Sequence, residues 1–272
     1  MSEIEKHLTL PTPLSPKDTK VLEEFDAAEI IPRWAAKVAR ERIHHKTAID
    51  WNAPRRPCVL HPSAADNPCD FFLYLQIVGG EGKYDIPPST QMIFDTGTAM
   101  HSQLQYYMET RAKFHRYLYK AEVGFGPTVN QNANALKMAG HIDGVSRGWP
   151  LKDSPLVWEF KTINKSGFER LTSPHSGYVK QAHLYMLAVG APVAIILYIC
   201  KDNSQLNSFK VPFDENVWRP MLKRLLYIRE CARKMEDPER RISSACKRCR
   251  FRLECKPDLS GLRSRGRLPG KF

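Results

Sequence analysis

The spacing of apolar positions divides the first half of the chain into helical stretches. Residues 1–18 are polar and broken by prolines, so we expect a flexible leader there. Thr19–His45 has the apolar spacing of an amphipathic helix, interrupted at Pro32 because proline cannot donate a helical hydrogen bond. A short capped helix ending at Gly79 and a longer one over Asp95–Phe114 are predicted next.

Three extended segments follow, rich in aromatic and β-branched residues. They cover residues 116–126, 136–148 and 155–164, and a turn-rich loop joins the last two. A helix, an apolar strand and a long basic helix come next, over residues 176–190, 192–202 and 214–235. This order predicts an α/β fold in which a mixed central sheet, starting as a meander, is flanked by helices.

Composition fits a globular protein of a reducing compartment. The 272 residues, 42% of them hydrophobic, suffice for one large domain with a sizeable core. The N-terminus does not have a signal-peptide pattern, and the longest apolar run, residues 191–200, is too short to span a bilayer. Seven cysteines in such a chain indicate thiols that bind metal more often than they form disulfides. We therefore expect a cytoplasmic protein without membrane contact.

Positive charge is concentrated at the C-terminal end. Residues 219–272 hold 17 Lys and Arg against 6 Asp and Glu, or +11, which leaves 24 against 23, or +1, for residues 1–218. This asymmetry indicates a polyanionic partner, most plausibly nucleic acid, with aromatic residues such as Trp218 and Tyr227 beside the bound strand. A solvated helix face and a disordered basic tail would give the same pattern.

The third extended segment carries "VWEFKTINK", in which two charged residues interrupt an apolar run. Because side chains alternate in a strand, Glu159 and Lys161 lie on one face, and Trp158 and Phe160 on the other. An isolated E-x-K is usually a solvated ion pair. Its neighbours decide between that interpretation and an active site.

The preceding segment contains "GHIDG", which ends at Gly144. A hairpin would bring Asp143 beside Glu159, and two adjacent carboxylates repel each other unless a cation lies between them. Mg²⁺ and Mn²⁺ prefer such oxygen ligands, and Lys161 would then orient or help to deprotonate a metal-bound water. His101, on the helix before the strands, is a candidate nitrogen ligand, although an interior histidine without that role is the commoner case.

The helix over residues 176–190 adds polar candidates. Gln181 and Tyr185 are four residues apart and therefore share a face, and Lys180 is adjacent. A packed tyrosine with a polar neighbour is the alternative interpretation.

A cysteine cluster lies near the C-terminus. The spacing C-x2-C-x5-C of Cys246, Cys249 and Cys255 allows three thiolates to converge on one metal centre. A fourth ligand is missing locally, and Cys69 or Cys58, both far upstream, could supply it. Cys200, in an apolar strand, and Cys231, in a helix, are expected to be buried structural thiols.

In this order, the motifs resemble the RecB-like branch of the PD-(D/E)XK nuclease superfamily. The branch has a helix histidine, G-x-x-D, E-x-K and Q-x-x-x-Y, matched here by His101, "GHID", "EFK" and "QAHLY". Ile142 replaces the proline of the superfamily name, which this branch commonly lacks. The resemblance implies a restriction-endonuclease-like core, covering roughly Ser63–Cys255.

The resemblance also implies roles for the matched residues. His101, Asp143 and Glu159 would bind Mg²⁺ or Mn²⁺ with the backbone carbonyl of Phe160. Lys161 would assist the attacking water, and the remaining two, Gln181 and Tyr185, would position the substrate backbone or that lysine.

The cysteines resemble those of the iron-sulfur subgroup, which includes AddB-type nuclease domains and CRISPR-associated adaptation nucleases. In that subgroup one upstream cysteine joins a C-terminal triplet, and Cys69 occupies the matching place. The resemblance implies a structural [4Fe-4S] cluster at Cys69, Cys246, Cys249 and Cys255, with zinc as the alternative. Arg248, Arg250 and Arg252 between them would lie against phosphates, unless they are simply solvated.

These inferences predict an N-terminal leader and a helical extension (1–60), a nuclease domain closed by an iron-sulfur-bearing helical lobe (61–256) and a basic, disordered tail (257–272). The expected activity is metal-dependent hydrolysis of DNA, as an exonuclease on single strands or DNA ends. The expected setting is a prokaryotic or phage-infected cell, with recombination, repair, replication or CRISPR adaptation proteins as partners. The alternatives are a non-catalytic DNA-binding protein with this fold and a zinc-stabilised interaction module.

Overall fold

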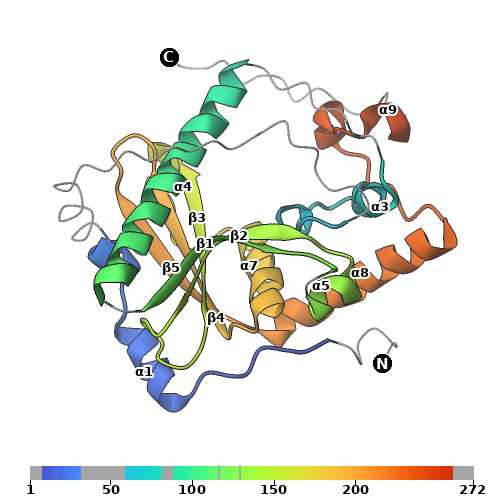
Figure 1. The fold of residues 1–272 in the computed structure, drawn as a ribbon. Coiled ribbons are helices and arrows are strands. Elements are labelled where there is room, and N and C mark those ends of the chain that lie inside the picture. The colour runs from blue at the N-terminus through green and yellow to red at the C-terminus, as the bar shows by residue number, and fades with distance from the viewer. Residues whose placement is uncertain are drawn as a thin grey trace.

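The computed structural model describes residues 8–31, 59–80, 82, 88–115, 117–128 and 130–259. The helices are α1 (Pro16–Glu24), α3 (Asp70–Val78), α4 (Pro88–His115), α5 (Gln131–Leu136), α6 (Lys165–Glu169), α7 (Ser176–Val189), α8 (Glu215–Lys234) and α9 (Arg252–Cys255), with the short 3₁₀ helices η3 (Pro62–Ala64) and η4 (Ser244–Arg248) (Figure 1). The strands are β1 (Leu118–Phe125), β2 (Gly140–Arg147), β3 (Leu156–Ile163), β4 (Val193–Cys200) and β5 (Leu206–Pro212).

The strands form a five-stranded mixed sheet in the order β1-β2-β3-β4-β5. The first three are antiparallel, as the predicted meander requires. β4 pairs with β3 in parallel and with β5 antiparallel. The parallel pair needs a crossover connection, which α6 and α7 supply. The predicted α/β fold with a mixed sheet flanked by helices is therefore confirmed.

Buried clusters lie on both faces of the sheet. Val157 and Ile196 pack in a cluster with residues of α7 and α8. The alternate positions, Trp158 and Ile195, pack in another with residues of α1 and α4. Every residue of β4 is buried, as expected for a strand covered on both faces. Glu159 therefore lies on the α7 face of the sheet, while its neighbours anchor β3 in the other layer.

The helix predicted over Thr19–His45 was wrong in its described part. α1 ends at Glu24, and a new helical turn starts after Asp26. The carboxylate of Asp26 accepts hydrogen bonds from the backbone N–H groups of Ala28 and Glu29, and so caps the new turn. Residues 32–58, which hold the rest of the predicted helix and Cys58, lie outside the described residues.

The N-terminal segment, for which the composition predicted a flexible leader, makes tertiary contacts from residue 8 onward. The backbone N–H of Thr9 donates to Asn132 Oδ1, and Asn132 Nδ2 donates to the Thr9 carbonyl. Ser15 caps α1 by accepting the N–H of Asp18. Tertiary contacts with α5, itself a helix that the apolar spacing did not predict, thus overrule the polar composition. Residues 1–7 and 260–272 lie outside the described residues.

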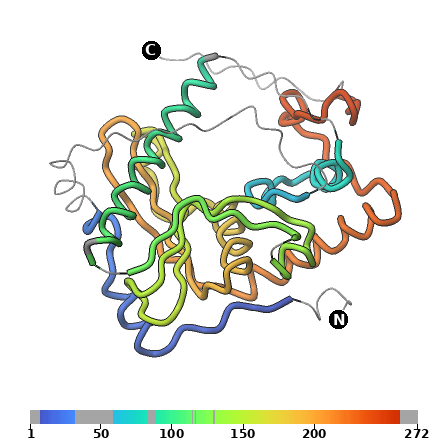
Figure 2. The backbone as a smooth tube through the Cα atoms, in the orientation of Figure 1, coloured from blue at the N-terminus to red at the C-terminus, as the bar shows by residue number. Residues whose placement is uncertain are grey.

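Helix α8 brings the C-terminal cysteines back to the early part of the domain. It is capped by Asp214 and ends before Met235, as predicted, and it contacts α3. Figure 2 shows the chain leaving α8 and returning to lie beside α3. Phe251 completes this contact, since its ring packs edge-on against Phe72 at 5.1 Å between centroids.

The strand β5 and the short helix α6 were not predicted from the sequence. β5 is an edge strand whose residues are mostly half-buried, so it has little apolar periodicity. α6 spans one turn and depends on Asn164, whose side chain accepts the N–H of Gly167. β5 is held by its pairing with β4, and α6 by its cap, so neither has a strong periodic signal in the sequence.

Candidate active site

The candidate site lies where β2 and β3 separate. Their ladder pairs Gly144 with Trp158, and the next residues along, Asp143 and Glu159, continue toward the fork. Beyond the last backbone pair, the backbone N–H of Phe160 donates to a side chain instead of a carbonyl. Its acceptor is Asp143 Oδ2, at 2.7 Å. The predicted hairpin thus brings Asp143 to the residue next to Glu159.

Gly144 permits a close approach at this point. A Cβ on Gly144 would overlap the hydroxyl of Tyr119. The phenol of Tyr119 therefore occupies the space that the missing Cβ of Gly144 leaves open.

Helix α4 covers the fork. His101 Nδ1 lies 3.7 Å from Asp143 Oδ1. One turn later on the same face, Gln105 Nε2 donates to the backbone carbonyl of Asp143 at 3.0 Å. α4 therefore contacts both the carboxylate and the backbone of this aspartate.

Glu159 and Lys161 are not a solvated surface pair. Glu159 is only 1% exposed, and its Oε1 is in contact with Lys161 Nζ. Trp158 and Phe160 are completely buried on the opposite face, as the strand alternation predicts. Two rigid aromatic anchors therefore hold the buried ion pair in place.

Helix α7 completes a polar network with this pair. Lys161 Nζ donates to Gln181 Oε1 at 3.3 Å, and Gln181 Nε2 donates to the hydroxyl of Tyr185 at 2.9 Å. Lys161 Nζ also lies 4.5 Å from the ring centre of Tyr178, a cation–π distance. The structure thus joins the E-x-K and Q-x-x-x-Y motifs through Lys161.

Burial and neighbouring charges shift the pKa values of these groups in opposite directions. Burial raises the pKa of Glu159 to about 7, although Lys161 opposes the shift. Burial would also raise the pKa of Asp143, but contact with His101 and the charge of Lys161 lower it overall. Burial lowers the pKa of Lys161, but Glu159 and Asp143 raise it more. The site therefore keeps a lysinium beside two carboxylates of unequal acidity.

The donor set fits a hard divalent cation. Glu159 Oε2 is buried and has no hydrogen-bond partner within the described ranges, which leaves an oxygen available to a ligand. Asp143 and His101 supply further donors at the fork. Among the residues that the structure describes, no three His, Cys, Asp or Glu side chains are already placed around a common metal position. The ligand set of His101, Asp143, Glu159 and the Phe160 carbonyl stays a prediction.

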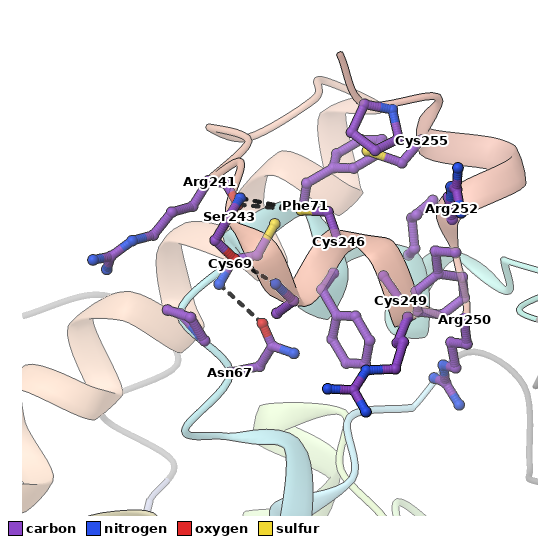
Figure 3. Close-up of a pocket in the computed structure, with 17 residues that line it drawn as sticks. Asn67, Cys69, Phe71, Arg241, Ser243, Cys246, Cys249, Arg250, Arg252 and Cys255 are labelled. Atoms are coloured by element: carbon purple, nitrogen blue, oxygen red, sulfur yellow. Dashed lines mark hydrogen bonds between the residues drawn. The ribbon is translucent and has the colours of Figure 1, made fainter. Parts of the chain in front are cut away.

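A separate pocket brings the four predicted cysteines together. It has a volume of about 260 Å³ and is lined by Cys69, Cys246, Cys249 and Cys255 (Figure 3). Cys69 precedes α3, and the others come from the segment that contains η4 and α9. All four thiols are free.

The four thiols line one pocket, but among the described residues no three Cys, His, Asp or Glu side chains are placed around a common metal position. Burial raises the pKa of Cys249 and of Cys255, and the other cysteines of the pocket raise both further. Such thiols favour either the protonated form or a bound cation. Cys200 and Cys231 are buried away from this pocket, as predicted. The identity of the bound group and the choice of Cys69 over Cys58 stay predictions.

The predicted nucleic-acid-binding residues have local partners. Lys180 pairs with Asp66. The guanidinium of Arg250 lies 5.3 Å from the ring centre of Phe72, and Arg248 and Arg252 line the cysteine pocket. None of these contacts tests the predicted role in binding phosphates.

The predicted role of Trp218 beside a bound strand was wrong. Trp218 is 2% exposed and packs in the core with the α7 cluster, because its position on α8 faces inward. Tyr227 is 48% exposed and stays a candidate.

Three residues of the site were not found from the sequence. Tyr178 lies three residues before Gln181 on α7, so helical spacing offered a signal for it. Gln105 lies four residues after His101 on α4, with a similar signal. Glu122, on β1, hydrogen-bonds to Gln105, and only the sheet register places it near the site.

Comparisons with known proteins give no family assignment. No family model matches the chain, and no curated protein is significantly similar to it. Among solved structures, SSO0001 matches with a TM-score of 0.43 and 14% identity, over 85% of this chain and 97% of that chain. An alkaline exonuclease from Laribacter hongkongensis, LHK-Exo, matches with a TM-score of 0.45 and 14% identity, over 66% and 90%. Its complex with dAMP gives 0.44 and 14%, over 65% and 89%.

These similarities are too weak to carry an argument about function. The function therefore has to be argued from the site itself. In the described part of the chain, no helix is long and apolar enough to cross a membrane.

Proposed function

We propose that the chain is a metal-dependent deoxyribonuclease of the RecB-like PD-(D/E)XK type. The observation that carries the proposal is the junction of four short motifs at one fork in the sheet. Asp143, Glu159 and Lys161 meet between β2 and β3, with His101 from α4 and Gln181 from α7 in contact with them. Motifs that are weak singly gain weight when one network joins them.

Each residue of the network has a role in phosphodiester hydrolysis. Mg²⁺ or Mn²⁺, when bound, would supply a polarised phosphate and a more acidic water. Asp143 and Glu159 would hold the cation, with His101 and the Phe160 carbonyl. Lys161 is kept charged by its carboxylate neighbours, so it would stabilise negative charge that develops on the phosphate.

Residues of α7 would position this lysine. Gln181 bridges Lys161 and Tyr185, so these two side chains set the orientation of the ammonium group. Tyr178 supports the ammonium group from its ring face. A fixed lysine loses little entropy when a phosphate arrives.

The substrate we propose is DNA, either single-stranded or with free ends, and the action is exonucleolytic. The excess charge of +11 after residue 218 supports a polyanion. Lys180, Arg248, Arg250 and Arg252 would contact its phosphates. Proteins of recombination, repair, replication or CRISPR adaptation are the partners that fit this activity, in the cytoplasm of a prokaryotic or phage-infected cell.

We also propose that the cysteine pocket holds a structural [4Fe-4S] cluster. The four thiols from the two ends of the domain support this assignment, and zinc is the alternative. A brown protein with broad visible absorption and bound iron would support the cluster. A colourless protein with stoichiometric zinc would instead show that the pocket holds zinc.

The test is degradation of 5′- and 3′-labelled single- and double-stranded DNA with Mg²⁺ or Mn²⁺. The wild type should shorten labelled strands, and Glu159→Ala and Lys161→Ala should each abolish this activity while keeping the circular dichroism spectrum. Undiminished cleavage by both variants would refute the site. A wild type that binds but does not cut DNA would instead support a non-catalytic DNA-binding protein, and one that does neither, with zinc bound, an interaction module.

A further inference from the structure

Glu122 has an unusual backbone at the level of the candidate site. β1 pairs with β2 on either side of it, through Ala121 with Gly144 and through Val123 with Ile142. Glu122 therefore lies opposite Asp143 in the register. Its φ is +49°, in the left-handed region that residues other than glycine rarely adopt. A strained residue inside a strand persists only where its surroundings hold it.

Gln105 supplies the group that holds Glu122. The side chain of Gln105 is buried, and its Nε2 donates to Glu122 Oε1 at 2.6 Å and to the Asp143 carbonyl at 3.0 Å. One amide therefore uses both of its hydrogens to tie Glu122 to Asp143. Glu122 itself is exposed, so its carboxylate is accessible to a ligand from solvent.

The carboxylate of Glu122 shares the electrostatic field of the site. Burial, followed by the charges of Glu159, Asp143 and Glu122, raises the pKa of Tyr185. The charges of all three carboxylates therefore act on the pKa of the same phenol. Within the described part of the chain, the buried Glu159 Oε2 has no hydrogen-bond partner, so one oxygen of these carboxylates is open to a ligand.

We propose that Glu122 is a further carboxylate of the candidate active site. Held beside Asp143 by Gln105, it raises the affinity of the site for Mg²⁺ or Mn²⁺ as a positioning and charge-supplying residue. The inference rests on the proposed function, because that function assigns the cation to Asp143 and Glu159. A negative charge on the residue opposite Asp143, tied to the Asp143 backbone through Gln105, strengthens the attraction of the site for a divalent cation.

The test is the binding of Mn²⁺ without DNA, followed by electron paramagnetic resonance of the free ion. Binding that Asp143→Asn removes defines the site in the wild-type protein. Glu122→Gln keeps the shape and the hydrogen bond from Gln105 but removes the charge. We expect it to raise the dissociation constant for Mn²⁺ by about tenfold, as loss of a supporting carboxylate does at other metal sites. Glu122→Asp, which keeps the charge, should retain more of the affinity.

Asp153→Asn is the matched control, since it removes one exposed carboxylate in the loop between β2 and β3. It should change the dissociation constant by less than about twofold, because distant surface charges are screened. If Glu122→Gln also stays within about twofold of the wild type, the inference is overturned and the proposed metal site stands. If the wild type has no Mn²⁺ binding that depends on Asp143, the proposed cation and this inference both fail.

Discussion

Asp143 Oδ2 accepts the backbone N–H of Phe160 at 2.7 Å, so a residue of the candidate site also completes the pairing of β3. Asp143→Ala would leave this N–H without its partner, at a cost of about 1–3 kcal/mol in the free energy of unfolding. Asp143→Asn keeps an acceptor and should cost less. Chemical unfolding of both variants measures the difference. Equal stabilities would show that the hydrogen bond is not structural.

Glu159 should make the metal-free protein less stable as pH rises. Burial raises its pKa from 4.5 to about 7, so the folded state holds the proton more tightly than the unfolded chain. This stabilisation is complete below about pH 4.5 and is lost as pH approaches 7, with a size on the order of 3 kcal/mol. Glu159→Gln removes the titration. Unfolding free energies without divalent cations should therefore favour the variant increasingly between these pH values, and parallel pH curves would contradict the assignment.

Arg224 should fix the segment that carries Cys69. Its guanidinium donates to Asp70 Oδ1 at 2.6 Å and to the carbonyls of Ala65 and Asn67 at 3.2 and 2.5 Å. Lysine cannot reproduce this fork, so Arg224→Lys should lower the free energy of unfolding by about 1–3 kcal/mol.

The control for Arg224 lies on the same helix. Arg219 is exposed, and within the described residues its guanidinium pairs with Glu215, so Arg219→Lys should change the free energy of unfolding by less than about 0.5 kcal/mol. The metal content of the purified proteins adds a second readout, because a loosened Cys69 segment should release the proposed metal to a chelator faster. Identical release from both variants would argue against this role.

Loss of the metal or cluster that we propose for the cysteine pocket should loosen the domain. Cys69→Ser and Cys249→Ser should each lose the iron or zinc and lower the unfolding temperature, because the site joins α3 to the segment after α8. Cys200→Ala, in β4, should keep the metal content of the wild type. Elemental analysis and thermal unfolding distinguish these outcomes. Full metal content in Cys69→Ser would move the fourth ligand to another residue, with Cys58 as the first to test.

The local sequence determined the elements that build the site. Alternation in "VWEFKTINK" placed Glu159 and Lys161 on one face, and a spacing of four residues put Gln181 and Tyr185 on one face of α7. These periodicities follow from backbone geometry alone, so they survive in almost any packing. The cysteine spacing likewise indicated a common site before any contact was known.

Only the tertiary structure decided which residues of different elements contact each other. The contact of Gln105 with Glu122 depends on how α4 crosses the sheet and on the register of β1 with β2. The inward position of Trp218 depends on how α8 packs, which its basic neighbours in the sequence concealed. Local periodicity determines which face of an element a residue occupies. Long-range packing determines which other element contacts that face, and no local pattern in a single sequence encodes this contact.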